Sequence, residues 1–139
     1  MGQIKTTLTV VNHADEVLAR RGVIASEQVR SVTLDDVLVD TGATVLCLPG
    51  TVIQQLGLNP VREVAVSTAN GYSRTQVFED AKIALLGRAG TFECVELPGG
   101  ERPLLGVVPL EAMGIELDLQ KQELRLLPSE GWDTYLTIL

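Results

Sequence analysis

Asp40 is the residue of this chain whose surroundings most favour chemistry. Two apolar runs, residues 37–39 and 45–48, stand on either side of it, and Thr41 and Gly42 follow it directly. Because short apolar runs are typical of buried strands, the sequence predicts a carboxylate held within a core. An ionised carboxylate in a core must be hydrogen-bonded, paired or partly protonated. The stretch is therefore interpreted as one that presents a single carboxyl group at a defined place.

An ordinary surface turn is the main alternative for this stretch, since Asp-Thr-Gly is also common turn chemistry. The acid of a surface turn would usually have polar neighbours. Asp40 has apolar neighbours on both sides, and this favours a functional carboxyl group over a structural one.

Other reactive groups are sparse in the sequence. His13 is the only histidine, and the neighbouring acids Asp35 and Asp36 lack the further ligands that calcium or zinc needs. A thiol nucleophile, Cys47 or Cys94 with His13 as its base, would require distant strands to converge. The chain has no Gly-x-Ser-x-Gly elbow of a serine hydrolase. The sequence therefore predicts no metal and no cofactor.

Short strands are expected to position Asp40. Val, Leu, Ile and Thr are abundant and aromatic residues make up 4% of the chain, which suits many short strands. Strands are predicted at residues 3–11, 29–39, 45–48, 64–78, 81–86, 91–97, 115–119 and 124–127, and helical segments at residues 14–21, 51–56 and 110–113. The pattern predicts an all-β fold with one or two short helices.

Residues 64–78 carry the clearest hairpin signal, because two alternating runs flank Asn70 and Gly71 as a two-residue turn. Such a hairpin can simply close a sheet. The residues around this turn are mainly polar, so its tip could instead move over a cleft and contact an extended substrate.

The net charge of −7 argues against nucleic acid and anionic membranes as partners. No apolar run reaches the length of a membrane span, and the N-terminus lacks a signal pattern. The sequence therefore predicts a cytoplasmic protein. In that setting reduced thiols are favoured for Cys47 and Cys94, although a disulfide between them stays open.

Residues 38–44, Leu-Val-Asp-Thr-Gly-Ala-Thr, resemble the active-site signature of the retropepsin-like aspartic proteases, and the chain resembles most closely the small single-domain bacterial members. Two further motifs fit this family. Leu104-Leu105-Gly106 matches an apolar pair and glycine at the end of a core strand, and the hairpin at 64–78 matches a flap. The resemblance implies a retropepsin-like acid-protease half-barrel with a flap hairpin.

The resemblance also implies residue roles, with Asp40 as the catalytic acid. The other implied site residues are Thr41, Gly42 and Ala43 in the active-site loop, Ala69, Asn70, Gly71 and Tyr72 in the flap, and Leu104, Leu105 and Gly106 in the cleft wall. Residues 1–139 are expected to form one domain with its core at about 29–127 and a C-terminal tail at 128–139.

Peptide hydrolysis in this family uses two carboxyl groups that share a proton, and this chain has one Asp-Thr-Gly. The resemblance therefore implies an aspartic endopeptidase that is a homodimer, with paired Asp40 residues acting on an extended peptide or unfolded protein. Thr44 and Val107 stand where retroviral members carry an acid and an arginine that pair. The dimer interface could use residues 3–11 or 132–139. The alternative function is a catalytically silent module that binds peptides or dimerises.

Overall fold

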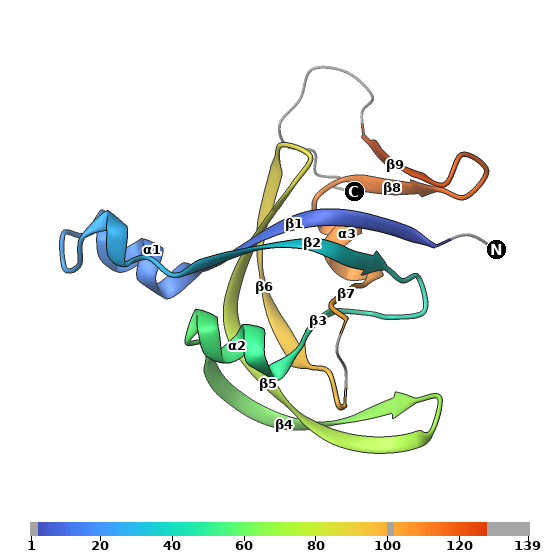
Figure 1. Ribbon diagram of the computed structural model, residues 1–139, viewed down its shortest axis with the longest axis horizontal. Helices are drawn as coiled ribbons and strands as arrows, with labels where there is room; N and C mark the ends of the chain where they lie inside the picture. The colour runs from blue at the N-terminus through green and yellow to red at the C-terminus, as the bar shows by residue number, and fades with distance from the viewer. Residues whose placement is uncertain (1–2, 100–101, 128–139) are drawn as a thin grey trace, which may run out of the picture.

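The computed structural model describes residues 3–99 and 102–127 and is built mainly from strands (Figure 1). In chain order its elements are β1 (Ile4–Asn12), α1 (His13–Arg20), the 3-10 helix η1 (Ser26–Gln28), β2 (Ser31–Val39), β3 (Leu46–Leu48), α2 (Gly50–Leu56), β4 (Asn59–Thr68), β5 (Gly71–Leu85), β6 (Arg88–Glu96), β7 (Leu104–Leu105), α3 (Val107–Ala112), β8 (Ile115–Asp118) and β9 (Glu123–Leu126). The predicted all-β fold is confirmed. The tail predicted at 128–139 lies outside the described residues.

The described residues contain three α-helices, which overlap the helical segments predicted at 14–21, 51–56 and 110–113, although the fold as a whole was predicted with one or two. α1 begins after Asn12, whose side chain accepts a hydrogen bond from the Asp15 amide and so caps the helix. α3 begins at two valines, Val107 and Val108, and β-branched residues favour strands. This local preference explains why the sequence marked only the later part of α3.

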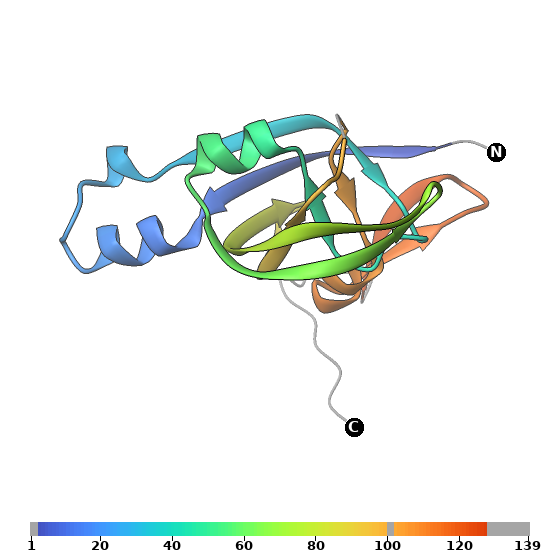
Figure 2. The same cartoon turned by 90° about the horizontal axis from the view of Figure 1, so that it is seen from below.

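Seven strands form one sheet that closes on itself. The strand order is β1-β2-β7-β3-β6-β5-β4, and β1 also pairs with β5, from Thr9 opposite Ala84 to Asn12 opposite Ala81. Within the described parts of the chain, β4 pairs with β5 alone and is therefore an edge strand. β8 and β9 form a separate two-stranded sheet. The β4–β5 hairpin lies across the near side of the molecule in Figure 2.

The core lies inside the closed sheet and is filled from alternate positions of its strands. Leu8 and Val10 of β1, Val37 of β2 and Leu105 of β7 are fully buried. Side chains two positions apart on a strand face the same side, which places these residues together inside. Burying one such side chain stabilises the fold by about 1.5–3 kcal/mol. The first strand thus contributes to the core that positions Asp40.

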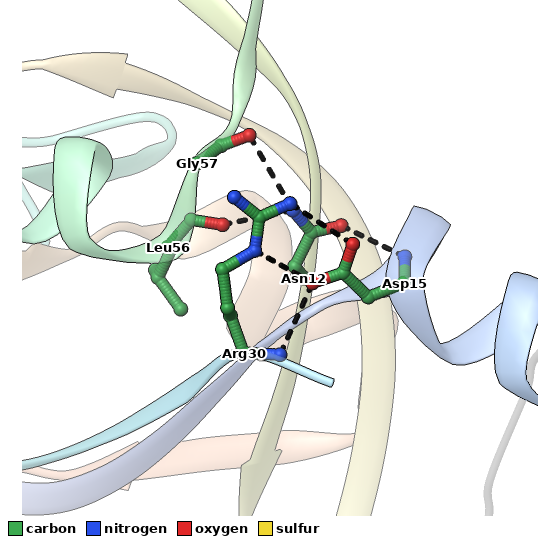
Figure 3. A network of polar contacts seen from close by, with 5 residues as sticks. All are labelled: Asn12, Asp15, Arg30, Leu56 and Gly57. Atoms are coloured by element: carbon green, nitrogen blue, oxygen red, sulfur yellow. Dashed lines mark hydrogen bonds and ion pairs between the residues drawn. The ribbon is translucent and has the colours of Figure 1, made fainter. Parts of the chain in front are cut away.

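A polar network holds α1 and the start of β2 against the end of α2 (Figure 3). Asn12 Nδ2 donates a hydrogen bond to Leu56 O at 2.8 Å. Arg30 donates from Nε and Nη2 to the two carboxylate oxygens of Asp15 at 2.8 and 3.0 Å. A Cβ on Gly57 would come within 1.8 Å of Arg30 Nη1. Glycine at this position therefore lets the guanidinium lie over the end of α2.

Asp15→Asn is expected to lower the melting temperature at about pH 7 and to lower it less at about pH 3, below the ordinary pKa of the carboxyl group. Hydrogen bonds from Arg30 hold the pKa of the Asp15 carboxyl below its ordinary value of 3.8, although burial opposes them. A carboxyl group with a lowered folded-state pKa contributes stability above its unfolded-state pKa, and this contribution disappears as the pH falls through the folded-state pKa. Thermal unfolding of both proteins at the two pH values tests this. An equal difference at both would contradict it.

Arg88 joins the turn between β5 and β6 to the end of α3. Its side chain is 2% exposed, and its Nη1 donates to the carbonyl oxygens of Met113 and Gly114 at 3.0 and 2.6 Å. These carbonyls follow the C-terminus of α3, where a positive charge is favoured. The strand predicted to begin at residue 91 begins at Arg88, because the turn is the pair Leu86 and Gly87.

Candidate active site

The loop after β2 carries Asp40 and is fixed by backbone hydrogen bonds to β7 and the start of α3. β7 runs parallel to β2 on one side and antiparallel to β3 on the other. The Asp40 amide donates to Leu105 O at 3.1 Å, and the Gly106 amide donates to Val45 O at 3.1 Å. The Val107 amide donates to Ala43 O at 3.0 Å. The structure therefore brings together the two sequence motifs at residues 40–43 and 104–106.

Gly106 lies against the backbone of Thr44 and Val45. A Cβ at this position would meet the carbonyl carbon of Thr44 and the nitrogen and oxygen of Val45, each at 2.6 Å. These are backbone atoms that cannot rotate away. Glycine is therefore required at 106 for β7 and the Asp40 loop to keep this contact.

Asp40 is half-buried, and the residues that follow it lie at the surface of the single chain. Its Oδ1 accepts a hydrogen bond from the Gly42 amide at 2.8 Å. Thr41 and Gly42 are exposed and Ala43 is half-buried. The prediction that the Asp40 carboxylate lies within the core is wrong for the isolated chain, where Asp40 is half-buried. The apolar residues before Asp40 enter the core, but Asp40 is the first residue beyond the strand.

A cavity of about 720 Å³ opens beside Asp40. Its walls come from the Asp40 loop, from β3, β4 and β6, and from β7. The apolar part of the wall includes Val45, Val64, Val66, Val77, Val95 and Leu104. Of the cleft-wall residues predicted from the sequence, Leu104 faces the cavity, whereas Leu105 is buried in the core and Gly106 is buried beside the loop.

The β4–β5 hairpin supplies the part of the cavity wall that comes from β4, Ala69 and Val77. The turn of this hairpin lies one residue earlier in the sequence than predicted. Thr68 pairs with Gly71, so Ala69 and Asn70 form the turn. Gly71 has a φ of 104°, a conformation that favours glycine, which is why the Asn-Gly signal located the hairpin but not its register. Among the four predicted flap residues Ala69 alone lines the cavity, and Tyr72 is 87% exposed.

Both cysteines are free thiols, and they lie on adjacent strands. Cys47 of β3 is opposite Val95 of β6, while Leu46 is opposite Cys94. Successive side chains of a strand point to opposite faces, so Cys47 lines the cavity and Cys94 is buried in the core. Burial raises the pKa of the Cys47 thiol, and the negative charge of Asp40 raises it further.

Iodoacetamide is expected to alkylate Cys47 slowly at neutral pH in the wild type and faster in Asp40→Asn. The thiolate is the reactive form, and removing the Asp40 charge removes one of the two causes of the raised pKa. Intact-mass spectrometry over time measures the rate. Cys94 is the internal control, because burial raises its pKa to about 12. Equal rates of Cys47 alkylation in the two proteins would show that Asp40 does not act on this thiol.

Sequence reasoning did not assign Cys47, Arg62 or Glu93 to the cavity that they line. The spacing of Arg62, Val64 and Val66 was a usable signal, because residues at every second position of a strand share one face. The pairing of β6 with β3 had no such signal, because the residue pattern of a strand does not identify a partner that is distant in the sequence.

A family model described as "gag-polyprotein putative aspartyl protease" matches residues 31–112, which is more than half of the chain. The matched range contains the Asp40 loop, the β4–β5 hairpin and β7. Among solved structures, the solution structure of the Simian Foamy Virus (mac) protease is similar at 22% sequence identity with a TM-score of 0.44, covering 57% of this chain and 81% of that chain. None of the curated proteins matches the chain.

Proposed function

This chain belongs to the retroviral-type aspartyl protease family, and we propose that it is an aspartic endopeptidase that cuts extended peptides or unfolded proteins. The observation that carries the proposal is the position of Asp40. Its carboxyl group stands on a hydrogen-bonded loop at the wall of a cavity, and the β4–β5 hairpin forms another wall of the same cavity.

The proposed enzyme is a homodimer in which each chain supplies one Asp40. The reaction needs two carboxyl groups, and the single chain presents one Asp-Thr-Gly loop. Thr41 and Gly42 are exposed beside Asp40, so this loop can meet its symmetry-related copy in an isologous contact. Thr41 would then bridge to the opposite loop.

In the proposed reaction the dimer holds one proton between the two Asp40 carboxyl groups. The ionised carboxylate takes a proton from a water molecule, which attacks the scissile carbonyl carbon. The protonated carboxyl group donates a hydrogen bond to the carbonyl oxygen as negative charge develops there. Proton transfer to the leaving nitrogen then completes cleavage of the C–N bond.

The proposed substrate lies as an extended strand between the Asp40 loop and the β4–β5 hairpin. The hairpin acts as a flap that excludes water and offers backbone hydrogen bonds to the peptide. Because the cavity wall near Asp40 is largely apolar, we expect hydrophobic side chains close to the cut bond.

The direct test is incubation of the wild type with a mixed peptide library from mildly acidic to neutral pH, with products identified by mass spectrometry. Cuts beside hydrophobic residues are expected, and activity per chain should rise with protein concentration as dimers form. A folded dimer that cuts no peptide at any pH would contradict the proposal and favour a catalytically silent binding module.

The cytoplasmic location stays a prediction. The use of residues 3–11 or 132–139 in the dimer interface also stays a prediction. No helix in the described parts of the chain is long and apolar enough to span a bilayer. β1 is paired on both edges from Thr9 to Val11, since β2 lies on one side and β5 on the other. Among residues 3–11, a strand from a second chain could therefore pair only near the start of β1.

A further inference from the structure

Arg62 and Glu93 form a bidentate ion pair at one end of the cavity that contains Asp40. Arg62 Nη1 donates to Glu93 Oε2 at 3.1 Å, and Nη2 donates to Oε1 at 2.9 Å. The two side chains are 53% and 42% exposed, so the pair is open to a ligand. The hydrogen bonds from Arg62 also lower the pKa of the Glu93 carboxyl, which keeps it ionised at neutral pH.

The two members of the ion pair lie on two of the strands that line the cavity, Arg62 on β4 and Glu93 on β6. On β6, Glu93 lies two residues before Val95, which is opposite Cys47 beside Asp40. On β4, Arg62 lies two residues before Val64. Residues two apart on a strand face the same side and are roughly 7 Å apart. Glu93 therefore lies about one step of an extended peptide beyond the apolar wall at Val95, while Arg62, which is opposite Val77, reaches it from the level of Val95.

We infer that Glu93, held by Arg62, selects a basic side chain, lysine or arginine, in the substrate. The inference rests on the proposed function only in taking the ligand of the cavity to be an extended peptide. Side chains of such a peptide that face the cavity recur every second residue. A hydrophobic side chain against Val95 would place the next cavity-facing side chain at Glu93, two residues along the peptide.

The charge of the cavity favours a cation over an anion at this end. Among the described lining residues, Asp40 and Glu93 are acidic and Arg62 is basic, and the chain as a whole carries a net charge of −7. Arg62 already donates to both oxygens of Glu93, and each carboxylate oxygen keeps a further acceptor position. A lysine or arginine of the peptide can occupy these positions, so that Glu93 bridges two cations.

The experiment measures peptide binding to Asp40→Asn, so that cleavage does not enter the result. The probes are fluorescein-labelled decapeptides of Ala, Val and Leu, with Lys, norleucine or Glu placed at each position in turn. We expect Lys to strengthen binding over norleucine about two- to fivefold at one position, two residues from a preferred hydrophobic residue. Glu should weaken binding at that position, and high salt should reduce the preference.

Glu93→Gln, added to Asp40→Asn, is expected to abolish the preference for Lys at that position. The matched control is Glu116→Gln, since Glu116 pairs with Arg125 outside the cavity at almost the same exposures, 44% and 53%. This control changes the net charge equally and should keep the preference. Peptides that bind equally with Lys and norleucine, or that fail to bind, overturn the inference. Because cleavage by the wild type is a separate measurement, loss of the Lys preference and loss of the proposed activity are distinguishable.

Discussion

The Asp40→Asn variant is expected to cleave peptides at least about 1,000-fold more slowly than the wild type, because paired acid and base catalysis contributes on this scale. Asn retains an oxygen that can accept the hydrogen bond from the Gly42 amide, so the loop should keep its conformation. It cannot take a proton from water or share one with a second carboxyl group. Initial rates at limiting peptide concentration give kcat/KM for both proteins.

Asp36→Asn is the matched control for this loss. Asp36 is also a carboxylate of the β2 region, but it is exposed and pairs with Lys5 and Arg102. It does not line the cavity beside Asp40. Its replacement should leave kcat/KM near that of the wild type. Equal losses in the two variants would show that the effect of Asp40→Asn is one of general charge or folding.

Gly106→Ala is expected to have the largest effect on stability, a loss of about 3 kcal/mol or more in the free energy of unfolding. The added Cβ would lie 2.6 Å from three backbone atoms of Thr44 and Val45. Relief of that overlap requires β7 to move away from the Asp40 loop, which breaks the bond from the Gly106 amide to Val45 O. Urea unfolding measures the loss. Any folded fraction should also have lost activity, since the same loop carries Asp40.

Gly50→Ala distinguishes this backbone overlap from the general effect of adding a methyl group. A Cβ at Gly50 would lie 2.9 Å from the carboxylate end of the Glu96 side chain. That side chain is flexible and can move aside, and Gly50 begins α2, where alanine is favourable. Its replacement should change the unfolding free energy by less than about 1 kcal/mol. Similar losses at positions 50 and 106 would contradict the role given to Gly106.

Local patterns predicted the features of this fold that depend on neighbouring residues. The alternation in β1, the Asn-Gly signal near the hairpin and the apolar runs around Asp40 each reflect such preferences. The shift of the hairpin turn to Ala69 and Asn70 was not predictable in the same way. The turn lies at Ala69 and Asn70 because Thr68 pairs with Gly71. The residues near the tip are compatible with either turn position, so their types alone do not select one.

Features that depend on distant pairing were beyond sequence patterns. The exposure of Thr41 and Gly42 follows from where β2 ends against β7, and not from the apolar runs alone. The cavity is lined by β3, by β6, which pairs with β3, and by β4, whose Arg62 contacts Glu93 of β6. The residues of β3 and β6 do not show, by their types alone, that these two strands pair. Sequence reasoning therefore identified the Asp40 loop but not the ion pair of Arg62 and Glu93 in the cavity beside it.

Mixing wild type with Asp40→Asn tests most directly the claim that two Asp40 carboxyl groups act together. The two proteins are combined at a fixed total concentration, allowed to exchange subunits, and assayed for cleavage of one peptide. If each active site needs Asp40 from both chains, an equal mixture should retain about a quarter of the wild-type activity, the share of dimers with two intact chains. Once subunit exchange has been verified, retention of about three quarters would show that one Asp40 per dimer suffices. Retention of about half would show that each chain acts independently, and either result would contradict the paired mechanism.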